Sequence, residues 1–294
     1  MIRTAVLAAI ALAASATAAC AQETFDPALY VLRDADSTMY LYGTVHVRPR
    51  GTDWGDNDVR SALASAEEIW TEIEISPQTD ARAQSLAMQL GAAPADKPLS
   101  SWLTAEENAR LDALAQRLGL QRAYLEPMRP WMAGLTLSLV PIMQAGYDPM
   151  SGVDRAVDAY GDSNAKTMRS FETIEQQLGF FSGLDEETQR AFLREAIEEA
   201  EEGPAMIREM TTAWERGDLD TLERSVVDDT REEYPDVYEA LFVRRNNAWM
   251  EVLVRELNGS GVDFVAVGAG HLLGPDGLVA QLRRRGYTVE RVGE

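Results

Sequence analysis

The only two histidines of the chain occupy the same local pattern at opposite ends of the sequence. His46 closes Gly43-Thr44-Val45-His46 after the apolar run 39–45, and His271 closes Gly268-Ala269-Gly270-His271 after the apolar run 263–267. In each segment the glycine lets the backbone turn or approach a neighbour closely. Because sites form where the strands of an α/β sheet end, the pattern predicts that the first and last strands meet and that both histidines share one site.

The pattern of apolar residues predicts an α/β fold with β-rich N- and C-terminal segments that form a central sheet around a large helical middle. The runs 29–33 and 39–45 flank a turn and predict a hairpin. We expect one domain over residues 22–294, with a helical insertion at about 80–258. Further strands are expected at 68–75, 165–171, 263–267 and 287–292. Helices are expected at 58–66, 104–118, 131–144, 152–160, within 186–228, and at 237–257 and 275–285.

Composition excludes several classes of protein. The chain has 48 acidic against 27 basic residues and a formal net charge of −21, which argues against a nucleic-acid partner. Its 46% of hydrophobic residues is typical of a globular protein. A single cysteine allows no intrachain disulfide and no cysteine-based zinc finger.

The first 21 residues have the pattern of a secretory signal peptide. Arg3 gives a positive start, an apolar run follows at 5–14, and Ala19-Cys20-Ala21 resembles a cleavage site. We therefore expect a periplasmic or secreted protein. Lipidation of Cys20 is an alternative, although Thr17 stands where a lipoprotein signal favours Leu or Val. The longest later apolar run, 131–143, contains glycine, serine and proline and predicts a buried helix instead of a membrane span.

A strand with two acidic residues follows the first histidine. In Glu72-Ile73-Glu74-Ile75 alternate residues share a face, so both carboxylates lie on one side. Two histidines and one carboxylate form a known catalytic zinc site and also suit manganese, cobalt or iron. The metal would lower the pKa of a bound water, and the second carboxylate would act as a base or orient a histidine. The alternative is an ordinary half-exposed strand.

Other common catalytic motifs are missing from the sequence. There is no HExxH zinc-protease helix and no G-x-S-x-G nucleophile elbow. Gly268-Ala269-Gly270 and Gly274 weakly imitate a dinucleotide fingerprint, but their spacing differs from that motif. Pro275 is explained more simply as the first residue of a helix.

Taken together, these segments resemble the TraB/GumN family, which includes the Tiki proteases. The segments 41–46 and 267–272 look like its first and last motifs. Between them, Gly152-Val153-Asp154 resembles the family's Gly-Ile-Asp, and Phe171-Glu172-Thr173 with Gln176 resembles its Leu-Glu-Thr…Gln stretch. Arg245-Asn246 stands where an Arg-Asn pair is expected. The resemblance implies a fold related to the erythromycin-esterase and ChaN-like group.

The resemblance also implies roles for individual residues. His46 and His271 would bind a divalent metal (manganese, cobalt or zinc), Glu72 would be a ligand or base, and Arg245 would polarise a substrate carbonyl. Further residues would support this site, although Asp154 and Glu172 are equally well explained as favouring helix starts. The supporting residues are Gly43, Glu74, Asp154, Glu172, Asn246 and Gly268.

Three functions follow from these patterns. The first is an exported metal-dependent hydrolase that cleaves a peptide or a similar amide. The second is a metal-free esterase-like enzyme with a histidine as general base. The third is a binding protein for haem or an envelope factor, with histidine as axial ligand.

Overall fold

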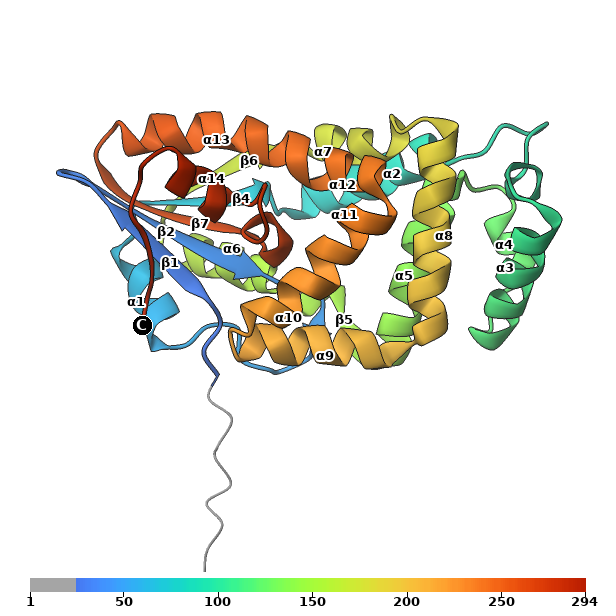
Figure 1. Ribbon diagram of the computed structural model, residues 1–294, viewed down its shortest axis with the longest axis horizontal. Coiled ribbons are helices and arrows are strands. Elements are labelled where there is room, and N and C mark those ends of the chain that lie inside the picture. Colours follow the sequence, from blue (N-terminus) through green and yellow to red (C-terminus); the bar gives the residue numbers. More distant parts are fainter. Residues whose placement is uncertain (1–24) are drawn as a thin grey trace, which may run out of the picture.

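The computed structural model describes residues 25–294, and its centre is a six-stranded sheet in the order β6-β4-β7-β2-β1-β8 (Figure 1). From β6 to β2 neighbouring strands are parallel, whereas β1 is antiparallel to both β2 and β8. The predicted α/β class and the predicted first hairpin are confirmed. The strands are β1 (Leu29–Arg33), β2 (Ser37–Thr44), β4 (Glu68–Ile73), β6 (Thr167–Glu172), β7 (Gly261–Gly268) and β8 (Val289–Arg291).

The two segments that end in histidine leave the sheet side by side. β2 pairs with β7 along its whole length, and Thr44 lies opposite Gly268 at the end of the ladder. A side chain at Gly43 would place its Cβ 3.1 Å from the Cα of Ala269, so glycine allows the two segments to approach closely. The prediction that distant ends of the chain meet is confirmed.

Helices cover both faces of the sheet, as Figure 1 shows. α13 (Arg244–Leu257) and α14 (Leu278–Arg284) pack on one face, and α1 (Asn57–Ser65), α6 (Val153–Ser163) and α9 (Pro204–Glu215) pack on the other. The central strand β2 is therefore buried on both sides. Leu41 packs in the core beneath α13, Tyr42 packs in the opposite core, and neither has any exposed surface. Burial of both faces explains why the sequence of β2 does not alternate strictly.

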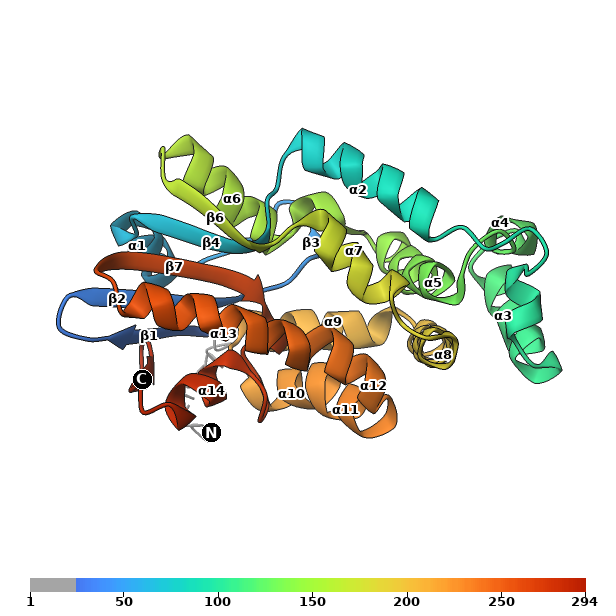
Figure 2. The same cartoon turned by 90° about the horizontal axis from the view of Figure 1, so that it is seen from above.

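A helical extension with its own core projects from one end of the sheet (Figure 2). Its core consists mainly of leucines and alanines, among them Leu111, Leu137 and Leu193. Thr104 caps one of these helices through the predicted capping box with Glu107, with contacts of 3.2 and 2.7 Å. The helices are α2 (Pro77–Leu90), α3 (Ala105–Arg117), α4 (Arg122–Leu125), α5 (Pro130–Gln144) and α8 (Glu186–Glu202).

The remaining short elements connect the extension to the sheet. The π-helical segment Glu239–Val243 runs directly into α13 and forms part of the predicted long helix. A two-stranded sheet of β3 (Arg48–Pro49) and β5 (Tyr147–Asp148) was not predicted, because strands of two residues leave no periodic pattern. The other helices are α7 (Ile174–Ser182), α10 (Leu219–Glu223), α11 (Asp229–Glu233) and α12 (Pro235–Tyr238).

Two predicted boundaries are wrong. The last helix begins at Leu278 and not at Pro275, because residues 274–277 form a turn and Gly277 precedes the helix. β4 ends at Ile73, so Glu74 lies beyond the strand. The hydroxyl of Ser76 then caps α2, in which Pro77 is the first residue.

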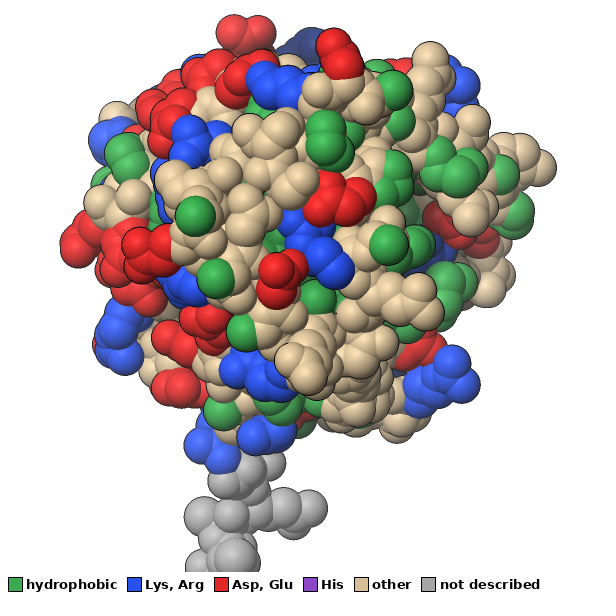
Figure 3. All heavy atoms as spheres, turned by 90° about the vertical axis from the view of Figure 1, so that its right-hand side faces the viewer, with side chains coloured by type: hydrophobic (Ala, Val, Ile, Leu, Met, Phe, Trp, Pro, Cys, Tyr) green, Lys and Arg blue, Asp and Glu red, His purple; other side chains and the backbone are tan. Residues whose placement is uncertain are grey.

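The surface carries the acidic excess of the sequence. Figure 3 views the molecule from the end formed by the helical extension and shows acidic side chains gathered toward its left edge. Among the helices of residues 25–294, none has the length and apolar character needed to cross a membrane. The predicted signal peptide and Cys20 lie outside the described residues.

Replacing Leu41 by alanine is expected to lower the free energy of unfolding by about 3 kcal/mol, because it leaves a cavity between the sheet and α13. Chemical denaturation measures the change. The matched control is Leu139→Ala, since 38% of that leucine is exposed, and we expect less than about 0.5 kcal/mol there. Equal losses in the two variants would contradict the observed packing.

Candidate active site

Four ionisable side chains lie at the carboxyl ends of the four parallel strands. Glu172 ends β6, Glu72 lies one residue before the end of β4, and His46 follows β2. His271 lies in the helical turn directly after β7. Because these strands are neighbours in the sheet and point the same way, four distant parts of the sequence converge at one edge.

The guanidinium of Arg245 binds three of these side chains at once. Its Nη2 donates to Glu72 Oε2 at 2.6 Å, and its Nε donates to Glu172 Oε1 at 3.0 Å. Its Nη1 donates to His271 Nε2 at 3.1 Å and more weakly to the Leu241 carbonyl at 3.4 Å. Arg245 comes from α13, directly after the π-helical segment, and it is buried. The N–H groups of Arg245 therefore donate to other groups of the protein.

The two carboxylates around Arg245 have different surroundings. Burial raises the pKa of Glu172, although Arg245 and the Trp249 indole, which donates to its Oε1 at 2.9 Å, oppose the increase. Burial also opposes the charge of Glu72. The charge of Arg245 nevertheless holds the pKa of Glu72 well below its ordinary value, and the backbone N–H of Gly268, which donates to Oε1 at 2.7 Å, acts in the same direction. Glu72 is therefore ionised.

His271 is held as a neutral imidazole. The Asn246 amide donates to the Asp276 carbonyl at 2.9 Å, which turns its oxygen toward His271 Nδ1 at 2.7 Å. Nδ1 therefore carries the proton, and Nε2 accepts from Arg245. Burial of the ring, with the charge of Arg245, lowers the pKa of His271 to about 3 despite nearby Glu72.

His46 has the opposite character. Its ring lies in an open part of the cleft with 61% of the side chain exposed, and Nδ1 contacts Asp154 Oδ1 at 3.3 Å. The crowding of protein atoms around the ring opposes a charge. The hydrogen bond and charge of Asp154, with the charge of Glu72, outweigh this effect and raise the pKa of His46 to about 9.

The segment Gly152-Val153-Asp154 packs directly against the end of β2 and brings Asp154 to His46. Val153 N donates to the Val45 carbonyl at 2.9 Å. A Cβ at Gly152 would lie 2.7 Å from the carbonyl oxygen of His46, so this approach requires glycine. Asp154 is the second residue of α6, where a carboxylate also favours the helix dipole. Asp154 therefore contacts His46 and also favours the start of α6, so both explanations of this residue apply.

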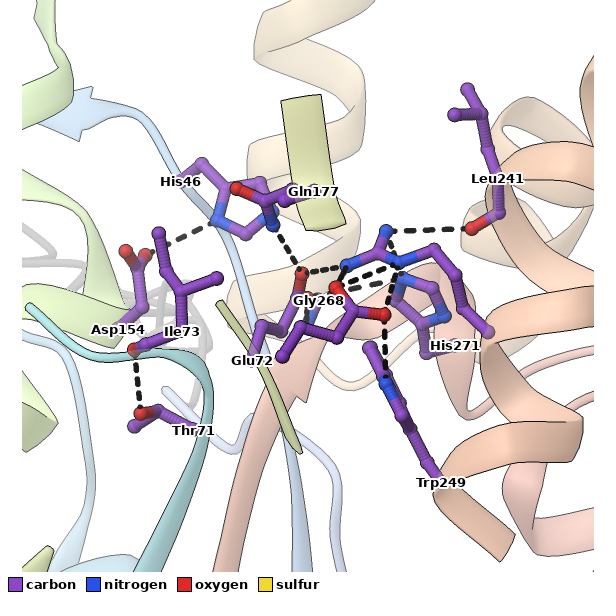
Figure 4. A network of polar contacts seen from close by, with 12 residues as sticks. His46, Thr71, Glu72, Ile73, Asp154, Gln177, Leu241, Trp249, Gly268 and His271 are labelled. Carbon is purple, nitrogen blue, oxygen red and sulfur yellow. Dashed lines mark hydrogen bonds and ion pairs between the residues drawn. The ribbon is translucent and has the colours of Figure 1, made fainter. Parts of the chain in front are cut away.

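Three of the predicted site residues converge at Gly268. A Cβ at this position would lie 3.1 Å from Glu72 Oε1, 3.3 Å from His46 Nε2 and 3.7 Å from His271 Cδ2. Figure 4 shows Glu72 between the two histidines, with Gln177 contacting the same carboxylate at 3.3 Å. A side chain at position 268 would crowd these groups, so glycine lets them converge at the end of β7.

This arrangement does not fit the predicted metal site of His46, His271 and Glu72. Both ring nitrogens of His271 are already engaged, one by Asn246 and one by Arg245. A cation at His271 Nε2 would lie beside the guanidinium and be repelled by it. No group of three or more His, Cys, Asp or Glu side chains within residues 25–294 is placed to hold a metal ion. The same contacts leave His271 without a free nitrogen for haem.

The remaining predicted residues differ in whether they contact the site. Glu74 is exposed and makes no ion pair within the described part of the chain, while Asp154 and Asn246 are the residues that orient the two histidines. Gln177 and Trp249 were not predicted, because neither belongs to a short motif. Trp249 follows Arg245 by one helical turn, and this spacing was the only available signal.

The fold and site define an α/β protein with a buried arginine–carboxylate–histidine cluster at the ends of its parallel strands. The sequence matches the model of the TraB/PrgY/gumN family over residues 28–291. The chain therefore belongs to this family, and the predicted resemblance is confirmed. Neither a search of curated proteins nor a search of solved structures found a match.

Replacing Asp154 by asparagine is expected to lower the pKa of His46 from about 9 toward its ordinary value of 6.5. Because the pKa of His46 is raised in the folded protein, the His46–Asp154 pair stabilises the fold fully below about pH 6.5. This contribution to stability is lost as the pH rises through about 9. Proton NMR of the two histidines, assigned with His46→Gln, measures the shift. Asp162→Asn on the same helix is the control. An unchanged pKa in Asp154→Asn would contradict the pairing.

Replacing Arg245 by leucine is expected to lower the free energy of unfolding by about 3–5 kcal/mol, because Glu72 and Glu172 would remain buried without a cation. Thermal and chemical denaturation measure the loss. Arg245→Lys should lose less, since it keeps the charge but not the forked contacts. A loss under about 0.5 kcal/mol in Arg245→Leu would show that the cluster is not a structural requirement.

Proposed function

We propose that this protein is a hydrolase that cleaves a peptide or a similar amide or ester, with His46 as the general base. The observation that carries the proposal is the His46–Asp154 pair, whose ring lines a cavity together with the ionised carboxylate of Glu72. Asp154 fixes the tautomer of His46 and would stabilise the imidazolium formed when a water proton is taken up.

The other side chains support this role in different ways. Glu72 holds negative charge near the His46 ring, and a water in the cavity that both side chains line would contact the two groups. Arg245 would reach a substrate carbonyl only by exchanging its weak 3.4 Å contact with Leu241 for the substrate. His271 and Glu172 would fix the position of Arg245 and leave the substrate to the open side of the cleft.

Metal dependence and export remain separate proposals. The family resemblance implies manganese, cobalt or zinc, whereas the engaged nitrogens of His271 favour the metal-free alternative. Export rests on the signal-peptide pattern of the first 21 residues.

The test is the pH dependence of hydrolysis by protein without its first 21 residues, using quenched fluorescent peptides and activated esters. The general base must be neutral, so kcat/KM should rise with pH until about 9. In Asp154→Asn the rise should occur at lower pH and reach a lower maximum. His46→Gln should reduce kcat by about 10²–10⁴-fold.

Chelation separates this mechanism from the metal-dependent alternative. Metal content is measured in the wild-type protein, His46→Gln and His271→Gln, and activity is compared before and after chelation. Activity that survives chelation supports His46 as base. Activity lost on chelation and restored by manganese, cobalt or zinc would overturn the general-base mechanism while retaining the hydrolase.

A further inference from the structure

Two cavities of different chemical character open on either side of His46 and Arg245. One has a volume of about 310 Å³ and the other about 370 Å³. His46, Arg245 and Phe181 line both cavities, so these residues form the wall between them. Any substrate whose reacting carbonyl lies at His46 therefore has one cavity available on each side.

The smaller cavity is apolar. Apart from Arg245 in the shared wall, its lining contains no Asp, Glu, Lys or Arg from the described residues. Helix α9 contributes Ile207 and Met210, and the π-helical segment contributes Leu241 and Phe242. Its size suits a large aliphatic or aromatic group, whose burial there would be favourable.

The larger cavity carries a small acidic excess, because its lining contains four carboxylates (Glu72, Glu74, Asp80 and Asp154) against Arg155, Arg245 and the His46 ring. Three of these carboxylates have a partner, because Asp80 pairs with Arg155 at 2.7 Å, Glu72 with Arg245 at 2.6 Å and Asp154 with His46 at 3.3 Å. Glu74 has no such partner among residues 25–294 and extends from the end of β4 into the lining. Its negative charge is therefore available to a ligand.

The neighbouring helix α6 is consistent with a negative potential at this cavity. Asp158 lies one turn after Asp154 on the same helix. Burial raises the pKa of Asp158 to about 6, with Asp162, Asp154 and Glu74 adding to the effect against Arg155. A cationic group that entered the cavity would approach two of these carboxylates, Glu74 and Asp154, which line it.

We propose that the substrate carries a large apolar group on one side of the reacting carbonyl and an ammonium or guanidinium group on the other. The proposal rests on the proposed hydrolase function, because it places the reacting carbonyl at His46. The apolar group occupies the cavity lined by α9 and the π-helical segment, and the cationic group lies beside Glu74. A peptide bond between a bulky apolar residue and a basic residue has this chemistry.

The experiment uses blocked dipeptides extended by neutral linkers, in both residue orders: Phe–Lys, Phe–Gln, Ser–Lys and Ser–Gln. Binding to the His46→Gln variant is measured by calorimetry, and cleavage by the wild-type protein is measured as kcat/KM. We expect the Phe–Lys pair, in one order, to bind and react at least about tenfold better than the peptides lacking either group.

Two variants assign the preferences to the two cavities. Glu74→Gln should reduce the Lys-over-Gln preference by about tenfold, whereas Glu290→Gln on the exposed strand β8 should not change it. Met210→Gln should reduce the Phe-over-Ser preference, whereas the exposed Met88→Gln should not. Circular dichroism and thermal unfolding check that each variant is folded.

The outcomes separate the two proposals. Selective binding without any cleavage would reject the hydrolase and leave the substrate preference in place. Cleavage of all the peptides at similar rates would retain the hydrolase and overturn the substrate preference. Failure to bind any of the peptides at millimolar concentration would also overturn the preference, as would a Lys preference unchanged by Glu74→Gln.

Discussion

A buried guanidinium is the constraint on which the strand-end cluster depends. Arg245 is surrounded by two carboxylates and an imidazole nitrogen, and each of these groups comes from a different strand end. Removing charges from water is costly, so such a cluster persists only where donors and acceptors are matched closely. The matching extends outward through Trp249, Gly268 and Gln177. The ends of β4, β6 and β7 are thereby fixed relative to α13, and one side of the cleft is rigid.

The two histidines of the paired motifs consequently have different properties. His271 is enclosed by the rigid cluster, neutral, and engaged at both nitrogens. His46 is exposed to the cleft and paired with a carboxylate on α6. A similar sequence pattern therefore gives one structural imidazole and one that can exchange protons at the cleft. The difference arises because α13 packs against β7, while the ring of His46 contacts Asp154 of α6 and lines both cavities.

Much of the fold could be predicted because its elements carry long periodic patterns. The apolar runs of β2 and β7 indicated both strands, and the shared G-x-x-H pattern at the end of each run indicated that the chain ends meet. The convergence of His46, Glu72 and His271 followed from the same reasoning. The contacts within the site could not be predicted in this way. Arg245 is far from Glu72 and His46 in sequence, and no local pattern shows that it lies beside His271. Gln177 was missed for the same reason, and the helix start at Leu278 was obscured by a proline that belongs to a turn.

The most direct test of this account is nitrogen-15 NMR of the two histidine rings at about pH 7, before and after addition of zinc. We predict a neutral His271 protonated at Nδ1 and a cationic His46, and we expect zinc to leave the resonances of His271 unchanged. A zinc-dependent shift of His271 Nε2 would contradict it, because that nitrogen would then be a metal ligand and not the partner of Arg245.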